Sequence, residues 1–434
     1  MNRQQTFDLF QQGAEAWNAW ADDMLSKKQD LQESGDWDDG AESTWNETTR
    51  SWHQQAKANF WKRTFDGPVE FVRFRFPGEA FFARSRFTDG ANFSSAEFHH
   101  TVNFSRVRFE GFAHFKNTEF RETATFTHAA FPDHLMIENA TFSGVFRFLA
   151  ATISRFASIS GSVFSAHALF GQSSFEVPLH ITQTEFRKGA NFKAVHGKGL
   201  FLRDVSFAQL PSFVGADFEA APEFDIVELD PGRLNKLARQ QSGSDFPADW
   251  RALRRLAAQG HDHECEIQFL TGEIIARRGT IDTWSRPRFW AGLLYEVLSD
   301  FGRSMALPVL WLAAGIWVFA GIYASHNPEL AEAPYGQEVP CTSGSGSTRT
   351  AAWVLSVHNA FPFAGIGSSG NLERTYACLY GMHSQDPSEQ EPMLWASSPN
   401  IPASVAFLGA IQFLLSAVLI FLLVLAIRNW FRIK

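Results

Sequence analysis

The chain has 434 residues, more than one ordinary domain needs, and 44 of them are phenylalanine, so a large apolar interior can form. Its formal net charge is −8, and the acidity lies mostly in residues 1–60, which hold 11 acidic and 5 basic side chains. Three cysteines exclude a fold that is built on disulfides.

Residues 1–64 are predicted to form a helical arm. Apolar side chains recur there at helical spacings: Phe7, Phe10, Trp17, Trp20 and Leu25. We expect one amphipathic helix over these positions, a loop from Ser34 to Thr49 and a second helix from Thr49 to Trp61. No basic flank leads into an apolar run, so no signal peptide is expected. Because bare strand edges aggregate, we expect the helices to cap the domain that follows. Docking of a partner by the tryptophans is the alternative.

Residues 65–225 carry a periodic pattern of large apolar side chains. From Phe71 to Phe192, a Phe or Ile falls at alternating steps of five and six residues. A helix repeats its apolar face every 3.6 residues and a half-buried strand every 2, so the longer period indicates a stack of similar units. We expect these side chains to form an internal core, and they include Phe93, Phe98, Phe104, Phe109, Phe115, Phe120, Phe126, Phe131 and Phe142.

The substitutions within the pattern give the length of one coil. Ile137, Ile159 and Ile181 recur at a constant spacing of four steps, whereas Phe148 and Phe170 lie midway between them. If one coil were only two steps long, these isoleucines and phenylalanines would alternate at the same position of successive coils. The four steps are four sides of five, six, five and six residues, which predicts a square β-helix of roughly seven coils, about 34 Å long.

The units resemble those of the pentapeptide-repeat family, which place Phe or Leu at the centre and a small residue two positions earlier. Tandem examples are Ala91-Asn92-Phe93-Ser94-Ser95 and Ala96-Glu97-Phe98-His99-His100. The resemblance covers roughly residues 65–224 and implies a mainly β fold, a right-handed quadrilateral β-helix with flanking α-helices. Some soluble members mimic DNA with a strongly negative rod. Residues 61–224 hold 17 basic and 16 acidic side chains, so we expect no such role and no nucleic-acid partner.

After the repeat the frame slips at Val195-His196-Gly197-Lys198-Gly199-Leu200, where a corner insertion or bulge is expected. Residues 226–304 then change to helical spacing and predict a hairpin of two helices that end at Gly260 and Gly279. Its basic residues are expected to contact lipid headgroups or water, with a nucleic-acid patch as the alternative: Arg251, Arg254, Arg255, Arg277 and Arg278.

The hairpin also holds His261, His263 and Cys265 close together. We interpret them as a polar turn around Asp262, which would cap the second helix, because no second pair of metal ligands is nearby. No metal and no cofactor are expected.

Residues 305–434 are predicted to form a two-helix transmembrane domain. Met305–Ala324 and Ile401–Ile427 lack charges and are each long enough to cross a hydrocarbon core of about 30 Å. Arginine and lysine cluster before the first span and after the second. The positive-inside rule therefore predicts a bacterial inner-membrane protein with both termini in the cytoplasm and loop 325–400 in the periplasm.

Two further features follow from that topology. Cys341 and Cys378 fall in the loop and are expected to form a disulfide, whereas Cys265 stays a free thiol. In the second span, Gln412 shares a face with Gly409 and Ser416, which is typical of a seam between helices. A pore-lining role for Gln412 is the alternative.

The loop contains a short helical stretch, Thr350–Ala360, followed by a glycine-containing strip. This layout is similar to two-span tetrameric cation channels, in which backbone carbonyls line the ion path. The candidate pore residues are His358, Asn359, Phe363, Gly365, Gly367 and Gln412. A periplasmic loop with an interfacial helix is the competing interpretation.

The sequence shows no phosphate-binding glycine loop, nucleophile elbow or paired metal-ligand motif, so no enzyme is expected. We interpret the chain as a non-enzymatic membrane protein whose β-helix is a platform for an unknown protein partner. The alternative is an oligomeric pore with a regulatory β-helix. Membrane lipids and further copies of the chain are the other expected partners.

Overall fold

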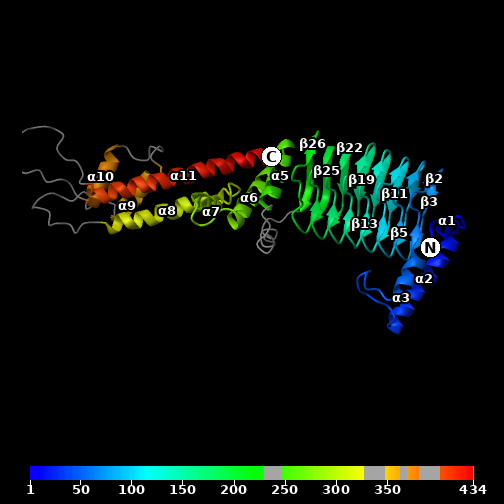
Figure 1. Ribbon diagram of the computed structural model, residues 1–434. Coiled ribbons are helices and arrows are strands. Elements are labelled where there is room, and N and C mark those ends of the chain that lie inside the picture. The colour runs from blue at the N-terminus through cyan, green and yellow to red at the C-terminus, as the bar shows by residue number, and fades with distance from the viewer. Residues whose placement is uncertain (229–245, 327–347, 362–368, 381–400, 434) are drawn as a thin grey trace, which may run out of the picture. The chain divides into compact units, whose positions relative to one another are not determined.

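The computed structural model describes residues 1–228, 246–326, 348–361, 369–380 and 401–433 (Figure 1). The chain divides into two compact units, Met1–Thr283 and Trp284–Lys434. The first holds a parallel β-solenoid with helices at its two ends. The second contains the long apolar helices.

Three helices precede the solenoid: α1 (Arg3–Gln11), α2 (Ala14–Ser34) and α3 (Glu47–Ala56). The single helix predicted from Phe7 to Leu25 is wrong. Gly13 separates α1 from α2 with φ of 89°, a conformation that glycine adopts without a steric penalty. The break turns α2 away from α1, and both helices then pack on the first coil.

Each turn of the solenoid contributes short strands to four parallel ladders. The first contains β1 (Ala58–Asn59), β5 (Ala80–Phe81), β9 (Val102–Asn103), β13 (Ala124–Thr125), β17 (Phe146–Arg147), β21 (Ala168–Leu169) and β24 (Ala190–Asn191). The second contains β2 (Thr64–Phe65), β6 (Arg86–Phe87), β10 (Arg108–Phe109), β14 (Ala130–Phe131) and β18 (Thr152–Ile153), and it continues into β22 (Ser174–Thr182), β25 (His196–Phe207) and β26 (Asp217–Phe218).

The third ladder has the longest strands. It contains β3 (Val69–Glu70), β7 (Gly90–Asn92), β11 (Phe112–Lys116), β15 (His134–Glu138), β19 (Phe156–Ser160), parts of β22 and β25, and β27 (Glu223–Glu228). The fourth contains β4 (Arg75–Phe76), β8 (Glu97–Phe98), β12 (Glu119–Phe120), β16 (Thr141–Phe142), β20 (Val163–Phe164), β23 (Glu185–Phe186) and the end of β25.

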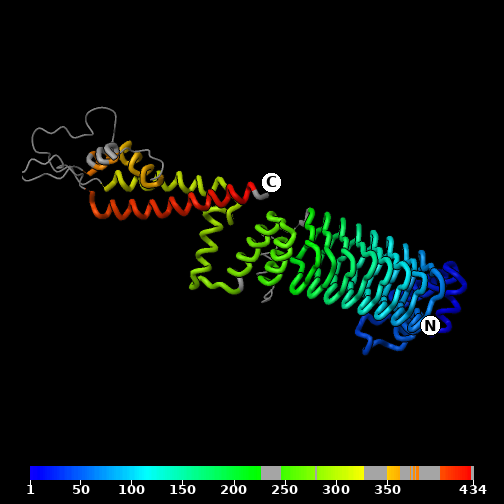
Figure 2. The backbone as a smooth tube through the Cα atoms, turned by 90° about the horizontal axis from the view of Figure 1, so that it is seen from above, coloured from blue at the N-terminus to red at the C-terminus, as the bar shows by residue number. Residues whose placement is uncertain are grey.

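The register of these ladders confirms the expected coil length of four steps. In the third ladder Phe115 pairs with Ile137, Ile137 with Ile159 and Ile159 with Ile181. Figure 2 shows the coils as stacked loops of the chain. The solenoid has about eight turns, compared with the roughly seven that were expected, and it extends beyond the predicted range at both ends, from Ala58 to Glu228.

One residue in every eleven takes a left-handed backbone conformation. The series includes Arg73, Arg84, Ser95 and Arg106, with φ between 55° and 60°. Each lies within a five-residue step, in a tight turn such as the one closed by the bond from the Ala96 N–H to the Phe93 carbonyl, 3.0 Å. In the six-residue steps between Phe71 and Phe192, positive φ occurs only at a glycine, Gly90, and at no residue with a side chain. The alternation of five and six therefore reflects two kinds of corner.

The predicted core is confirmed. All nine phenylalanines named above are no more than 1% exposed. At the frame slip the structure agrees with the bulge and not with the insertion: the register shifts between Phe175 and Pro178, and Ile181 then pairs with Leu202, one position short of the regular spacing. One coil is shorter by a residue.

After the solenoid, α5 (Phe246–Gln259) and α6 (His263–Thr280) form the predicted hairpin and cover the last turn. The side chain of Gln259 donates to the Phe218 carbonyl at 2.8 Å, and Arg255 donates to the Ala216 carbonyl at 2.6 Å. Trp250 is fully buried under this cover. The hairpin therefore caps the second end of the stack.

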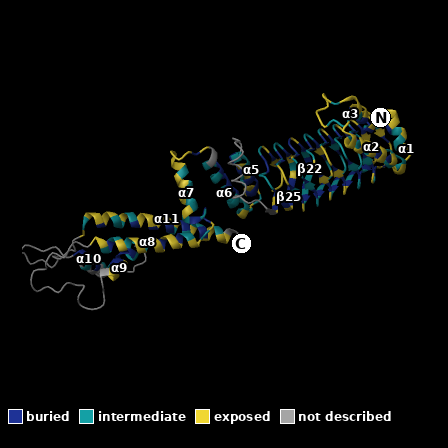
Figure 3. Ribbon diagram, turned by 90° about the horizontal axis from the view of Figure 1, so that it is seen from below, coloured by how far each residue is buried: buried dark blue, intermediate teal, exposed yellow. Residues whose placement is uncertain are grey.

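The second unit consists of α7 (Pro287–Ser299), α8 (Ala306–Ser325), α9 (Thr348–Ala360), α10 (Ser369–Tyr380) and α11 (Ala403–Ile433). Among the described residues, α8 and α11 are long and apolar enough to cross a membrane by length and composition. They lie side by side (Figures 1 and 2), and much of their surface is exposed in Figure 3.

Candidate functional site

Two predicted site residues, Gln412 and Asn359, meet in a buried polar network of the second unit. The Tyr323 hydroxyl donates to Oε1 of Gln412 at 2.8 Å, and the same hydroxyl oxygen accepts a hydrogen bond from Nδ2 of Asn359 at 3.1 Å. Gln412 is 2% exposed and Tyr323 is fully buried. The network thus joins α8, α9 and α11.

Ser356 completes the network. Nε2 of Gln412 donates to the Ser356 carbonyl at 2.9 Å and to its hydroxyl at 2.8 Å, and that hydroxyl donates to the Ile316 carbonyl at 2.8 Å. Both ends of the Gln412 amide therefore have partners. Satisfied polar groups between apolar helices hold the helices together, because the alternative is an unpaired group in a medium without water.

The same contacts locate α9. Ile316 lies near the middle of α8, and Gln412 is ten positions into α11. Ser356 bonds to both, so α9 packs against the interior of the two long helices. Short helix α10 joins this group through the Tyr380 hydroxyl, which donates to the Tyr323 carbonyl at 3.3 Å.

The face of α11 that was predicted from Gly409, Gln412 and Ser416 is turned inward. Ser416 is 6% exposed, and a Cβ added to Gly409 would lie 3.2 Å from Nδ2 of Asn359. Glycine at this position therefore lets α9 approach α11 closely.

The other candidate pore residues are not brought together by the described structure. Phe363, Gly365 and Gly367 lie outside the described residues. His358 is half-buried on α9, and within the described part of the chain its Nδ1 has no hydrogen-bond partner. The pore stays a prediction.

The cysteines divide as expected where they are described. Cys265 is a free thiol, and burial raises its pKa to about 12. Cys378 is disulfide-bonded. Because Cys341 lies outside the described residues, the Cys341–Cys378 pairing stays a prediction.

The arginines of the hairpin have a structural partner that the sequence did not indicate. Glu273 is only 4% exposed and lies 3.0 Å from Nε of Arg251 and 3.2 Å from Nε of Arg254. Arg277 is 3.9 Å from the same carboxylate. These three arginines neutralise a buried carboxylate inside the cap while their own side chains stay partly exposed, so the expected contact with lipid headgroups or water stays a prediction.

The His261–Cys265 turn has the predicted capping role. Oδ1 of Asp262 accepts the Cys265 N–H at 3.0 Å at the first turn of α6, and His263 contacts Glu266 at 3.3 Å. Among the residues that the structure describes, no cluster of three or more histidine, cysteine, aspartate or glutamate side chains has metal-binding geometry.

The outer surface of the third ladder differs from the other surfaces of the solenoid. In β11, β15 and β19 the inward residues are buried and the alternating outward ones half-buried, except for Lys116, which is exposed. We call this surface the histidine-aromatic face and define it by these outward residues: Phe112, His114, His134, Met136, Phe156, Ser158, His180 and Phe201. The same strands also present Lys116 and Glu138 outward, and these two form an ion pair at 3.6 Å.

Rings on this face pack on one another. Phe112 and His114 have centroids 4.7 Å apart, and His180 and Phe201 stack at the same distance. The second ladder presents Arg86 and Arg108 outward, and the fourth presents glutamates such as Glu97, Glu119 and Glu185. The signal was present in the sequence at the positions next to each inward residue. The periodic pattern of large apolar residues describes only the inward positions, so it does not predict this face.

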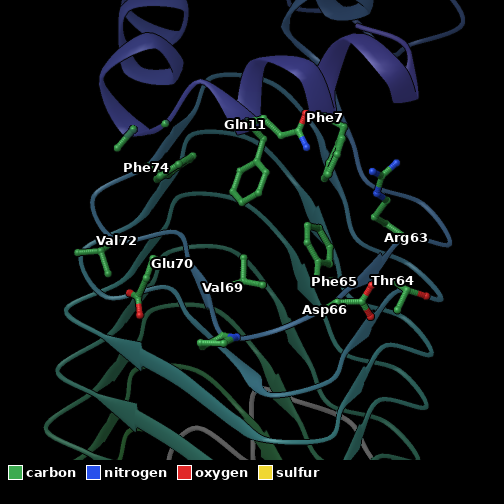
Figure 4. Close-up of a pocket in the computed structure, with 14 residues that line it drawn as sticks. Phe7, Gln11, Arg63, Thr64, Phe65, Asp66, Val69, Glu70, Val72 and Phe74 are labelled. Atoms are coloured by element: carbon green, nitrogen blue, oxygen red, sulfur yellow. The ribbon is translucent and has the colours of Figure 1, made fainter.

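A hollow of about 680 Å³ lies between α1 and the first coil (Figure 4). Phe7, Phe65 and Phe74 give it an apolar lining, and Arg63, Asp66 and Glu70 stand at its edges. The Arg63 guanidinium lies 3.3 Å from the centroid of the Phe7 ring. The first coil is therefore covered by α1 and α2 only in part.

Fold and network together define a β-solenoid protein with two helices that are able to span a membrane. Comparisons with models of protein families, with curated proteins and with solved structures find no match.

Proposed function

We propose that the protein is a membrane-tethered scaffold of the pentapeptide-repeat type, with a right-handed quadrilateral solenoid that acts as a platform for a protein partner. Small residues two positions before the internal phenylalanines support the family assignment, as does the length of the coils. The long apolar helices α8 and α11 support the tether. We assign no catalytic step to it.

The observation that carries the platform role is the histidine-aromatic face. Aromatic and imidazole rings and a methionine lie there on longer strands than in the other ladders. The charged residues of the same strands, Lys116 and Glu138, pair with each other, and the adjacent ladders present charged side chains such as Arg108 and Glu119. Aromatic residues and methionine are enriched at the centres of protein interfaces, where charged residues are depleted. A flat sheet surface also buries such side chains without rearrangement.

Site-specific photo-crosslinking in intact cells tests this role. A photoreactive residue at Phe112 or Phe156 should give a discrete crosslinked product, whereas the same residue at Arg108 or Glu119 should not. The additional substitution Phe201→Ser should weaken the crosslink and leave the solenoid folded. Equal crosslinking from all surfaces would contradict a dedicated platform.

For the orientation in the membrane, we propose cytoplasmic termini, an inner-membrane location and a periplasmic loop 325–400. The distribution of arginine supports this orientation. In intact, unreduced cells, a membrane-impermeant maleimide should leave Cys341 and Cys378 unlabelled until a reductant is added. Labelling of both before reduction would contradict the disulfide, and protection after reduction would contradict the periplasmic loop.

An oligomeric pore is the second candidate function. The observation that favours it is the packing of α9 against the interiors of α8 and α11, through Ser356. Conductance of the purified protein in planar bilayers is the test, with Gly365→Ala and Gln412→Leu as variants. Unitary currents that both variants alter would favour the pore, and silence of folded wild-type protein would favour the scaffold.

A further inference from the structure

Helix α7 has an exposed apolar stripe that no described element covers. Trp290, Leu294 and Val297 follow one another at helical spacing and are 51%, 55% and 46% exposed. Just before the helix, Trp284 is 76% exposed, and its carbonyl accepts a hydrogen bond from the Trp290 indole at 2.9 Å. Two tryptophans and two aliphatic side chains form a larger contiguous apolar patch than a surface that contacts only water usually has.

Hydrogen bonds tie α7 to one end of the long helices. The Trp311 indole, in the second turn of α8, donates to the Val297 carbonyl at 3.1 Å. Asn429, near the end of α11, donates to the carbonyl of Gly302, just after α7, at 3.2 Å. The start of α8 and the end of α11 therefore lie at the same level as α7. In Figure 3, α7 crosses the pair of long helices steeply.

The charge near this end is positive. Arg286 and Arg288 are exposed at the start of α7, and Arg303 and Arg428 are exposed at the ends of the neighbouring segments. Residues 284–303 contain three arginines against two acidic residues, Glu296 and Asp300. Tryptophan and arginine are the residues that proteins place at the boundary between acyl chains and headgroups.

We propose that α7 lies in the headgroup layer of the membrane and binds anionic phospholipids. This inference rests on the proposed membrane tether. A helix that crosses two spans at their common end runs along the bilayer surface, where an apolar stripe inserts at the acyl-chain boundary. Trp290, Leu294 and Val297 form that stripe, and it continues the exposed surface of α8 at Trp311. Arg286 and Arg288 then hold lipid phosphates by charge-assisted hydrogen bonds.

Full-length protein in vesicles tests the insertion. Leu294→Cys in a Cys265→Ser background is labelled with an environment-sensitive fluorophore and reconstituted with lipids that carry a nitroxide near the top of the acyl chain. We expect a blue shift and strong quenching at residue 294. Lys198→Cys, on the exposed surface of β25, is the matched control and should show neither.

A third label separates this inference from the tether itself. Phe421 on α11 is 66% exposed. The same fluorophore attached to Phe421→Cys, also in the Cys265→Ser background, should be quenched by a nitroxide deep in the acyl chains if α11 spans the bilayer. Quenching at 421 without quenching at 294 would overturn the α7 proposal alone. Absence of quenching at 421 would overturn the membrane tether.

The anionic preference is tested by varying phosphatidylglycerol in phosphatidylcholine vesicles. The double variant Arg286→Gln/Arg288→Gln should need a higher anionic fraction for the half-maximal shift at residue 294, because each lost arginine weakens the insertion equilibrium roughly fivefold. The control Arg187→Gln/Arg203→Gln removes the same charge from the solenoid and should change nothing. Identical curves for both double variants would overturn phosphate recognition, and so would a shift that is independent of anionic lipid.

Discussion

Phe93 and Phe115 stack face to face with ring centroids 5.1 Å apart and planes inclined by 4°, although they lie one full coil apart in the chain. Similar stacks link Phe71 with Phe93 and Phe98 with Phe120. The interior is therefore a set of columns of stacked side chains, in which each residue contacts the residue one turn before it and the residue one turn after it. Most of these neighbours are rings, but Phe115 is followed by Ile137.

The substitution Phe115→Asp should disrupt the solenoid. Phe115 is 1% exposed, so the change removes a full aromatic contact and buries a carboxyl group without a partner. We expect a loss of about 5 kcal/mol or more, because Phe→Ala in a core already costs about 3–5 kcal/mol. His114→Asp, one residue away on the outer surface, should cost less than about 1 kcal/mol. Retention of wild-type β-sheet circular dichroism and melting by Phe115→Asp would contradict the column.

The corner at Gly144 should not accept a side chain. A Cβ there would lie 2.1 Å from the backbone carbon of Glu122 in the preceding turn, so two turns of backbone would have to separate. We expect Gly144→Ala to cost about 3 kcal/mol. Gly199→Ala is the control, because its Cβ would meet its nearest neighbour at 3.5 Å, an ordinary contact. Chemical denaturation of both variants measures the difference, and equal midpoints would refute the close approach.

The solenoid was predictable because its signal is repeated. Phe115, Ile137 and Ile159 occupy equivalent positions, so each coil reports the same length independently. The ends were less predictable. Gly13 carries no periodic signal of its own, and the ion pairs between Glu273 and its arginines depend on tertiary contacts of the hairpin that side-chain spacing does not encode.

The polar network was predicted in part for a similar reason. Gln412 is conspicuous because an amide inside a long apolar run needs a partner, and Gly409 and Ser416 mark the face on which to expect it. Its partners were not visible. Tyr323 ends an ordinary apolar segment and Ser356 occupies a short helix, and only the packing of α8, α9 and α11 brings them to Gln412.

Docking of α3 on the solenoid should weaken in acid. His53 stacks on Trp45 with centroids 3.9 Å apart and contacts His100 on the solenoid, 5.1 Å away. Burial, and then the charges of His100 and Lys28, lower the pKa of His53 from 6.5 to about 4, while Glu79 acts in the opposite direction. The undocked arm therefore binds more protons between pH 6.5 and about 4, so the docked state loses stability as the pH falls through that window.

Limited proteolysis of the loop before α3 measures this effect. Cleavage should accelerate between pH 6.5 and about 4 in the wild type, with a protease whose own activity is corrected on an unfolded substrate. His53→Gln cannot take up the proton, so its cleavage rate should depend less on pH. A pH profile unchanged by His53→Gln would rule out His53 and assign the sensitivity to another group, such as His99, whose pKa is also lowered by burial.

The hydrogen bond between Tyr323 and Gln412 should make their substitutions non-additive. Tyr323→Phe removes the donor, and Gln412→Leu removes both the acceptor and the donor to Ser356. Each single change should destabilise the second unit by about 1 kcal/mol, a usual value for polar contacts between membrane helices. The double variant should cost less than the sum by about 0.5–1.5 kcal/mol, because the shared bond is lost only once. Thermal unfolding in detergent measures the stabilities of the two single variants and the double variant. Phe421→Leu on the exposed side of α11 is the control, and it should change neither the stability of the second unit nor the coupling between Tyr323 and Gln412. Strict additivity would show that Gln412 acts through Ser356 alone, and the link between α8 and α11 would then rest on apolar packing.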